Sequence, residues 1–490
     1  MSLKKRIIAR LDIKGSRLIK GIRFEGVRVI GNPRESAIRY YNEGIDEIFY
    51  SDAVASLYGR NSLFDLLKKT CKEVFVPVTA GGGIRSLEDA YMLLTAGADK
   101  IAINTYAVKT PELITSLASR FGEQCVVLSI QARRSSSVPS GWEVMIEAGR
   151  EKTGLDLAGW IKTGQRLGAG EILLTSVDQD GTQKGPDLDL LKLINSEVHI
   201  PIILGGGFNT IKQVNEAFKC ECLSGVSIGS SLHFKQLEIN EIKSDLVRSN
   251  IPIRLNREPC IKYNSPILNG VEIVVIDYGM GNQQSLINAF EFLGCNVILT
   301  DDPKTIEESK VAILPGVGSF PSGIEELSQR GLREILVNRF VSGKALIGIC
   351  LGMQLLFEES NEFSTTKGLG IFKGCVKNLK EHKINLGLLK EKAIENQIRL
   401  PHMGWNIVNK IEGNCEYINE KDFLNMPFYF VHSFGVEQAK ELSFEAKCNY
   451  CGTTPLAICG KEKTIGFQFH PERSGVAGLN LISNMLQRLI

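Results

Sequence analysis

The chain lacks any long run of apolar residues. None of its 490 residues belongs to a stretch approaching the ~18 consecutive apolar residues of a membrane-spanning helix. The N-terminus has only a few apolar residues before Asp12, far fewer than a secretion signal contains. We therefore expect no membrane association and a cytoplasmic protein.

An excess of charge of one sign is also missing. The sequence has 57 basic and 55 acidic residues, a net charge of +2, whereas nucleic-acid-binding surfaces carry a clear basic excess. Paired cysteine motifs are absent too. The closest of the 12 cysteines, Cys220 and Cys222, have no second pair with which to form a zinc site. We expect no nucleic-acid partner, no metal and no cofactor, and expect most cysteines to be small buried residues.

What the first half does contain is a regular alternation of short apolar strands and amphipathic stretches. From Arg6 to about residue 250, eight such strands are expected, and eight βα units in this length are typical of a (β/α)8 TIM barrel. The expected strands are RIIARLDI, EIFYSD, FVPVTAGGG, KIAIN, CVVLSI, EILLTS, PIILGGG and GVSIGS.

The barrel sequence repeats itself. PVTAGGGIRSLEDA in the first half is similar to PIILGGGFNTIKQV in the second, and DEIFYSD is similar to GEILLTS. Gly83 and Gly207 are 124 residues apart, and so are Glu47 and Glu171. The barrel therefore consists of two similar halves.

A second domain is expected after a linker. Residues 251–270 contain three prolines and no regular period, which is typical of a linker. A new strand then starts at VEIVVID, and the rest of the chain mixes strands with helices. We predict a barrel over 1–250, a linker over 251–270 and a second α/β domain over 271–490.

Glycine-rich loops follow several barrel strands, where their backbone N–H groups can approach an anion. GSS after the eighth strand starts a helix, whose N-terminus favours negative charge. Because the loops repeat between the halves, they predict two phosphate sites and a small molecule phosphorylated at both ends. The alternative is that these glycines only make tight turns. The candidate residues are Gly83, Asn104 and Thr105 in the first half and Asp180, Gly181, Gly206, Gly207, Gly229 and Ser230 in the second.

The second domain contains a candidate nucleophile. In ALIGICLGMQLLFEE, Gly348, Cys350 and Gly352 have the spacing of a nucleophile elbow between a strand and a helix. Downstream, GFQFHPERSG offers His470 as a base and Glu472 to orient it. A cysteine in an apolar run is usually a core residue, but here three motifs coincide. The third is LPGVGSF, which predicts an oxyanion hole formed by Gly316, Val317 and Gly318.

These motifs resemble a known family. IDYGMGN, LPGVGSF, GICLGMQLLFE, PHMGWN, YFVHSF and FQFHPERSG resemble the glutaminase part of imidazole glycerol phosphate synthase, a class I glutamine amidotransferase. KRIIARLDIKGSRLIKG, TAGGGIRS, GADKIAINT and GAGEILLTSVDQDGT resemble its cyclase barrel. The resemblance covers nearly the whole chain except the linker and the stretch around 379–398.

The resemblance implies a function. Glutamine would be hydrolysed in the second domain, and ammonia would pass along the barrel to a bisphosphorylated ribulosyl aminoimidazole carboxamide ribotide, in histidine biosynthesis. It also implies an ammonia gate of four charged residues, Arg6, Glu47, Lys100 and Glu171. Without the resemblance, these four would be ordinary solvated rim residues. Asp99 and Arg473 are expected to pair across the domain interface.

The family's barrel works with two aspartates, and this sequence retains one. Asp12 is the first, with Lys14 and Lys20 on the following loop, but Gln131 stands at the second position. An amide orients a ligand but does not exchange protons near neutral pH. The substitution is either tolerated or functional. The stretches VASLYGRN and LGGGFN near the mouth also differ from the family's usual wording.

Three hypotheses remain open at this point. The first is a complete synthase in which Asp12 is the principal acid/base and Gln131 a positioning residue. The second is a paralogue that supplies ammonia to a separate sugar amidotransferase in surface-polysaccharide biosynthesis. The third, a non-catalytic binding module, would not need the Cys-His-Glu arrangement.

Overall fold

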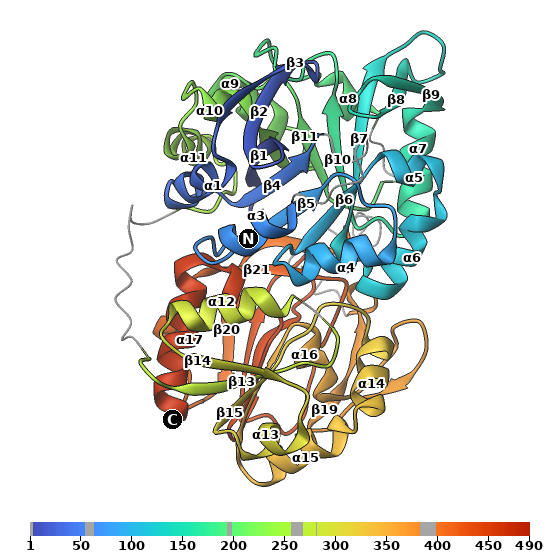
Figure 1. Cartoon of the computed structure of the whole chain (residues 1–490). Coiled ribbons are helices and arrows are strands. Elements are labelled where there is room, and N and C mark those ends of the chain that lie inside the picture. Colours follow the sequence, from blue (N-terminus) through green and yellow to red (C-terminus); the bar gives the residue numbers. More distant parts are fainter. Residues whose placement is uncertain (1–2, 54–62, 194–197, 256–267, 281, 383–397) are drawn as a thin grey trace. The chain divides into compact units, whose positions relative to one another are not determined.

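Parallel strands close into a barrel in the first half of the chain, as the sequence predicts (Figure 1). The computed structural model describes residues 3–53, 63–193, 198–255, 268–280, 282–382 and 398–490. In these residues the barrel has eight parallel strands. They are β1 (Arg6–Lys14), β4 (Glu47–Asp52), β5 (Val78–Gly81), β6 (Lys100–Ile103), β7 (Val126–Arg134), β10 (Glu171–Ser176), β11 (Ile202–Gly205) and β12 (Leu223–Ile228). Pairing of β12 with β1 and of β10 with β7 closes the ring.

The barrel interior is organised in layers, because every second side chain of a strand points inward. A buried apolar cluster marks the middle layer, with Ile8, Phe49, Ala102, Val127, Leu173 and Ile203. Two residues earlier on four of these strands stand Arg6, Glu47, Lys100 and Glu171. Two residues later come mostly polar side chains, Arg10, Ser51, Ser129 and Thr175. The apolar layer thus separates a charged layer at the strand starts from a polar layer at the mouth.

Amphipathic helices alternate with the strands of the barrel (Figure 1). Their first turns are fixed by capping side chains such as Asn32, Ser86, Asp156 and Thr210. The helices are α1 (Pro33–Asn42), α3 (Leu63–Thr70), α4 (Leu87–Thr95), α5 (Thr105–Lys109), α6 (Glu112–Phe121), α7 (Leu157–Arg166), α8 (Asp189–Lys192), α9 (Ile211–Phe218), α10 (Ser230–His233) and α11 (Ile239–Arg248).

Two hairpins extend the barrel strands in a way that the sequence analysis did not anticipate. The end of β1 pairs with β2 (Arg17–Ile22), which pairs with β3 (Glu25–Gly31). The end of β7 likewise pairs with β8 (Trp142–Ile146), followed by β9 (Glu151–Asp156). Both hairpins follow the carboxyl ends of barrel strands, where catalytic groups of such barrels lie.

The second half forms an α/β unit, as expected. Its nine-stranded sheet has the order β14-β13-β15-β16-β25-β24-β23-β20-β21 among the described residues. The parallel strands are β13 (Glu272–Ile276), β14 (Asn296–Thr300), β15 (Val311–Leu314), β16 (Ala345–Ile349) and β25 (Thr464–Phe467). The antiparallel strands are β20 (His402–Gly413), β21 (Pro427–His432), β23 (Phe444–Cys448) and β24 (Leu456–Lys461).

A smaller sheet and several helices complete this unit. The sheet consists of β17 (Phe357–Ser360), β18 (Thr366–Lys367), β19 (Phe372–Asn378) and β22 (Phe434–Gly435). The helices are α12 (Gln283–Phe292), α13 (Pro303–Glu308), α14 (Phe320–Gln329), α15 (Leu332–Val341), α16 (Leu351–Leu355) and α17 (Gly475–Leu489).

The contacts divide the chain into two compact units. One comprises Lys4–Ser119 and Glu123–Cys260, and the other Ile261–Ile490 together with Met1–Leu3 and Arg120–Gly122. Residues 256–267 of the expected linker and the stretch 54–61 lie outside the described residues. The boundaries at 250 and 270 therefore stay a prediction.

The structure also bears on the cysteines, on metal ligands and on membrane spans. Cys220 and Cys222 are joined by a disulfide, which the sequence analysis did not anticipate. Among the residues that the structure describes, no cluster of acidic, histidine and cysteine side chains is suited to hold a metal ion. None of the described helices is long and apolar enough to span a bilayer.

Candidate active sites

Cys350 lies at a sharp turn between a buried strand and a helix. It directly follows β16 and is the N-cap of α16, with φ 54° and ψ −109°, an unusual conformation for a residue with a side chain. Close backbone contacts explain why glycines surround Cys350. A Cβ at Gly352 would lie 2.0 Å from the carbonyl oxygen of Leu314, and one at Gly316 would lie 2.5 Å from the Gly352 nitrogen. The turn therefore has the geometry of the nucleophile elbow that the sequence spacing indicated.

His470 and Glu472 follow the strand next to the elbow, β25, which ends at Phe467. β25 pairs in parallel with β16, with Ile349 opposite Phe467, so the residues after both strands lie at one edge of the sheet. His470 Nδ1 is 2.7 Å from Glu472 Oε1. Burial disfavours an imidazolium here, but Glu472 and then Cys350 outweigh it and hold the pKa of His470 well above its ordinary value. The arrangement suits a thiolate paired with an imidazolium.

The loop expected to form an oxyanion hole packs against the elbow. Tyr278 donates a hydrogen bond of 2.7 Å to the Pro315 carbonyl, directly before Gly316 and Val317. Gly318 has a φ of +133°, in the region that favours glycine. The structure thus places residues 316–318 beside the nucleophile, and their role as oxyanion donors stays a prediction.

Gln468 is a residue that the sequence analysis missed. Its amide nitrogen lies 3.8 Å from the Cys350 sulfur, within hydrogen-bonding range for sulfur. Its amide oxygen accepts a 3.1 Å bond from Gln354, whose nitrogen is also 2.8 Å from the Phe434 carbonyl. Both glutamines lie in quoted motifs, FQFHPE and CLGMQ, but only folding brings them together.

Two buried histidines continue this network on β20 and β21. His432 Nδ1 is 2.8 Å from the Phe434 carbonyl, so it carries the proton, and Nε2 is left to accept from His402 Nδ1 at 3.0 Å. His402 Nε2 in turn accepts from Asn406 at 3.1 Å. Burial lowers the pKa of His432 to about 4 and that of His402 well below its ordinary value. A directed chain of hydrogen bonds between neutral groups therefore runs from Asn406 to the Phe434 carbonyl, which also accepts from Gln354.

The barrel mouth has two pockets, and each takes one group of the predicted phosphate-binding residues. The first is lined by Gly83, Asn104 and Thr105, together with Asp12 and Gln131. The second is lined by Asp180, Gly181, Gly206, Gly207, Gly229 and Ser230. At Gly207, φ is +83° and a Cβ would lie 2.2 Å from the Gly185 carbonyl oxygen, so the loop requires glycine. The helix that begins at Ser230, α10, has only four residues.

Asp12 is held by cations. Its two carboxylate oxygens lie 2.8 Å from Arg10 Nε and 2.8 Å from Lys20 Nζ, and Lys20 is also 3.0 Å from Asp180. Burial would raise the pKa of Asp12, but Arg10 and Lys20 outweigh it and hold the pKa well below its usual range. Asp12 is therefore ionised throughout the physiological range.

Gln131 faces the same pocket with an unsatisfied acceptor. Its side-chain oxygen is buried and has no hydrogen-bond partner within the described parts of the chain. The same holds for the side-chain oxygen of Asn104, whose nitrogen is 3.3 Å from the Met145 carbonyl. Buried acceptors without partners are costly, which favours a ligand that donates hydrogen bonds here.

The four residues expected as an ammonia gate form a closed ring at the strand starts. Arg6 pairs with Glu47 at 2.9 Å and with Glu171, and Lys100 pairs with both glutamates at 2.6 Å. All four are at most 1% exposed, which disagrees with a solvated rim. Burial opposes the charge of Glu171, but Arg6 and Lys100 lower its pKa. Alternating charges that neutralise one another make such burial tolerable.

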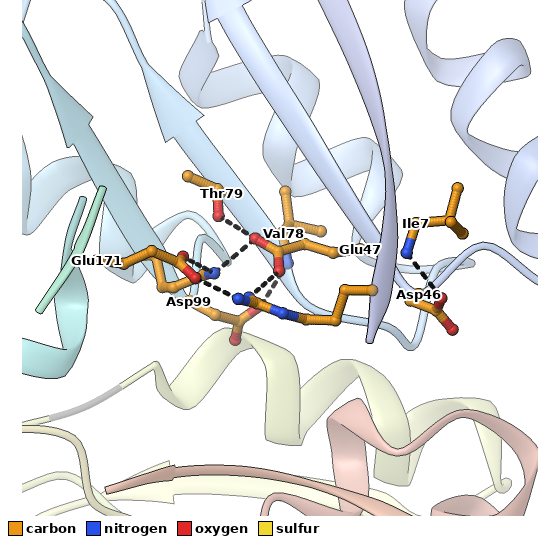
Figure 2. Close-up of polar contacts among 9 residues, drawn as sticks. Ile7, Asp46, Glu47, Val78, Thr79, Asp99 and Glu171 are labelled. Atoms are coloured by element: carbon orange, nitrogen blue, oxygen red, sulfur yellow. Dashed lines mark hydrogen bonds and ion pairs between the residues drawn. The ribbon is translucent and has the colours of Figure 1, made fainter. Parts of the chain in front are cut away.

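Carboxylates in and near the ring accept hydrogen bonds that join the starts of neighbouring barrel strands. Figure 2 shows Thr79 beside Glu47, where its hydroxyl donates at 2.7 Å. Asp99 accepts from the backbone nitrogen of Val78 at 2.8 Å, and Asp46 accepts from that of Ile7 at 2.9 Å (Figure 2). Within its own unit, Arg473 donates to the Ser285 hydroxyl. The pairing of Asp99 with Arg473 stays a prediction.

Comparison with known proteins divides the chain into two parts at about the same place as the structure does. Residues 6–238 match the family described as "Histidine biosynthesis protein" and residues 274–488 match "Glutamine amidotransferase class-I". "Imidazole glycerol phosphate synthase subunit HisF" of Legionella pneumophila is 57% identical over 210 residues, 43% of this chain and 98% of that protein. The chain belongs to the imidazole glycerol phosphate synthase family.

Further relatives of the same name cover the barrel. HisF of Wolinella succinogenes is 46% identical over 256 residues, which is 52% of this chain and 99% of the relative. HisF of Mycobacteroides abscessus is 43% identical over 258 residues, 52% of this chain and 100% of the relative. The protein is thus a glutamine amidotransferase and cyclase of the imidazole glycerol phosphate synthase type, with both parts in one chain.

Proposed function

We propose that the protein hydrolyses glutamine and transfers the ammonia, through the barrel, to a bisphosphorylated ribulosyl aminoimidazole carboxamide ribotide. The products would be imidazole glycerol phosphate and an aminoimidazole carboxamide ribotide, in histidine biosynthesis. One observation carries the choice of acceptor. The mouth has two pockets with glycine-rich linings, one from each half-barrel, which suits a molecule with a phosphate at each end.

In the glutaminase step, Cys350 acts as the nucleophile. Its thiolate attacks the carboxamide carbon of glutamine, and the oxyanion that forms is held by backbone N–H groups of the loop 316–318. His470, oriented by Glu472 at 2.7 Å, gives its proton to the departing nitrogen as the C–N bond breaks. Water then attacks the glutamyl thioester and gives its proton to His470, which releases glutamate and restores the thiolate and the imidazolium.

Ammonia enters the barrel at the ring of Arg6, Glu47, Lys100 and Glu171. The ring is sealed by its own ion pairs, so one of the pairs must open for ammonia to pass. Beyond it lies the apolar layer that contains Ile8 and Leu173, which admits neutral ammonia more readily than ammonium or water. This order of layers supports delivery to the mouth without release to solvent.

A direct assay tests the proposal. Purified protein is incubated with glutamine and the bisphosphorylated ribulosyl acceptor, called the ribulosyl bisphosphate below. Imidazole glycerol phosphate and glutamate are measured together. We expect both products in near-equal amounts. Glutamate without any imidazole glycerol phosphate would reject this acceptor, and would favour transfer of ammonia to a separate sugar amidotransferase.

A further inference from the structure

Arg10 is a charged residue inside the barrel that the sequence analysis did not consider. It lies on β1 between Ile8 and Asp12, one inward position above the apolar layer, and is only 5% exposed. A guanidinium at this depth keeps its charge and needs partners. Its partners therefore indicate what it does.

The side chain of Arg10 extends across the barrel interior. Nη1 is 3.3 Å from the Thr175 hydroxyl on β10, although β11 and β12 separate β10 from β1 in the sheet. The guanidinium also lies 5.2 Å from the ring centre of Phe24 and 5.6 Å from that of Phe49. Two aromatic faces and a hydroxyl fix its position without neutralising it.

Arg10 lines both pockets of the mouth. It stands with Gln131 and Asn104 in the first pocket and with Asp180 and Ser230 in the second. A ligand that places one phosphate in each pocket must therefore pass over the guanidinium.

The charged groups around Asp12 form a closed network. Arg10 and Lys20 each lie 2.8 Å from one of its oxygens, and Lys20 bridges to Asp180. His233 on α10 is a further titratable group close to Asp12 and Lys20, and burial together with Lys20 lowers its pKa to about 4. His233 is thus neutral at pH 7, and Asp12 faces two fixed cations. Both of its oxygens are engaged, which leaves it poorly placed to exchange protons with a ligand.

We propose that Arg10 is a ligand-binding and specificity-determining residue of the mouth. It holds Asp12 as a fixed counter-ion, attracts a phosphate into each of the two pockets that it lines, and donates hydrogen bonds to the middle of an acceptor phosphorylated at both ends. This rests on the proposed function. The group over Arg10 accepts hydrogen bonds, and the group facing Gln131 and Asn104 donates them, because their oxygens lack partners among the described residues. A carboxamide between the two phosphates has both properties.

The experiment compares Arg10→Met with Arg28→Met in the full-length protein. Arg28 on β3 is exposed, so Arg28→Met removes one positive charge from the surface and is the matched control for Arg10→Met. Titration calorimetry measures binding of inorganic phosphate and of the ribulosyl bisphosphate. We expect Arg10→Met to weaken binding of both about tenfold or more, as for loss of a charged hydrogen bond, and Arg28→Met to have less than about a twofold effect.

Carbon NMR of the aspartate carboxyls, with Asp12 identified by Asp12→Asn, supplies a readout that needs no ligand. The Asp12 signal should begin to titrate at higher pH in Arg10→Met than in the wild type. Arg10→Lys, which keeps the charge, serves if Arg10→Met does not fold, and should weaken binding while retaining most of the Asp12 effect.

Each outcome decides something. Unchanged phosphate affinity in Arg10→Met, no phosphate binding by the wild type, or an unchanged Asp12 titration would overturn the role of Arg10. Phosphate binding that depends on Arg10, without binding of the ribulosyl bisphosphate, would instead reject the proposed acceptor and leave the role of Arg10 standing.

Discussion

Substitution of Cys350 should separate the two proposed half-reactions, which are glutamine hydrolysis and the reaction of ammonia at the barrel mouth. Its strained turn places a thiol next to His470, while the barrel contains its own binding groups. Cys350→Ala should abolish glutamine-dependent turnover, because the alanine methyl group cannot form a thioester. Turnover with added ammonium salts should stay largely intact.

The check is to measure product formation with glutamine and with ammonium chloride in the same preparation. Ser342→Ala, in an exposed turn after α15, serves as a control for activity that is lost during preparation of any variant protein. Equal loss of both activities in Cys350→Ala would contradict separate sites.

Gln468 donates to the Cys350 sulfur at 3.8 Å, and a hydrogen bond to an anion is worth more than one to a neutral group. Gln468→Met keeps the length of the side chain and removes the donor. We expect alkylation of Cys350 by iodoacetamide at pH 7 to slow about three- to tenfold, since a lost hydrogen bond costs on the order of 1 kcal/mol. Alkylation of Cys350 in denaturant, where Gln468 no longer contacts it, should proceed at the same rate in both proteins. An unchanged rate in the folded variant would contradict a role of Gln468 in stabilising the attacking sulfur.

Gln131 occupies a position of the mouth where a carboxylic acid could supply the proton that Asp12, held as a counter-ion, does not. If the protein is a synthase, Gln131→Asp should raise cyclase turnover, because a positioned proton donor contributes roughly 10²–10⁴-fold. Measurement of imidazole glycerol phosphate formation with ammonium chloride isolates this step from the glutaminase. No gain in a variant that still binds the ribulosyl bisphosphate would show that the lack of an acid at this position is not limiting.

At the scale of elements, β20 and β21 contribute the paired histidines His402 and His432. Their folded-state pKa values lie below the ordinary value, with that of His432 at about 4, so the unfolded chain binds more protons between about pH 6.5 and 4. Stability is therefore complete above about pH 6.5 and is lost as the pH falls through this window. For His432 this loss amounts to at most roughly 3 kcal/mol.

Hydrogen exchange of the β20–β21 amides at pH 7 and pH 5 measures this effect. Protection should fall steeply at pH 5 in the wild type and less steeply in His432→Gln, which does not titrate. Nitrogen NMR of the histidines should show both rings neutral at pH 7, with the protons on Nδ1. A charged ring at pH 7 would contradict the proposed chain of hydrogen bonds.

At the scale of the whole molecule, the ring at the strand starts should determine how much ammonia reaches the acceptor. Lys100→Met opens the ring, so we expect glutamate to exceed the acceptor product and free ammonia to appear in solution. The reaction with ammonium chloride at the mouth should persist. Removing Lys100 also leaves both buried glutamates less well paired, at a cost of about 3–5 kcal/mol.

Lys219→Met is the matched control, because Lys219 forms an exposed pair with Glu216. Its ratio of glutamate to acceptor product should stay near that of the wild type, and thermal unfolding separates loss of stability from loss of coupling. A ratio that stays near one in a folded Lys100→Met variant would argue against the gate.

The sequence by itself determined the architecture. Alternation of runs such as EILLTS with amphipathic stretches fixed the barrel, because a strand buried on both faces must be apolar and each helix must bury one stripe. The 124-residue repeat indicated the two half-barrels. The motif around Cys350 and the motif around His470 and Glu472 were sufficient to propose a nucleophile and a base, since an elbow and an HPE segment are local features of the sequence.

Only the tertiary structure decided which distant side chains meet. Arg10 reads in sequence as one more residue of a strand, and its contact with Thr175 arises only when the barrel closes. The same is true of the link from His402 through Gln354 to Gln468, which joins three strands and a helix. The four charges of the ring are unremarkable in sequence, yet burial makes them depend on one another. Hydrophobic pattern is written along the chain, whereas ion pairs and hydrogen bonds depend on distances that closure of the sheet sets.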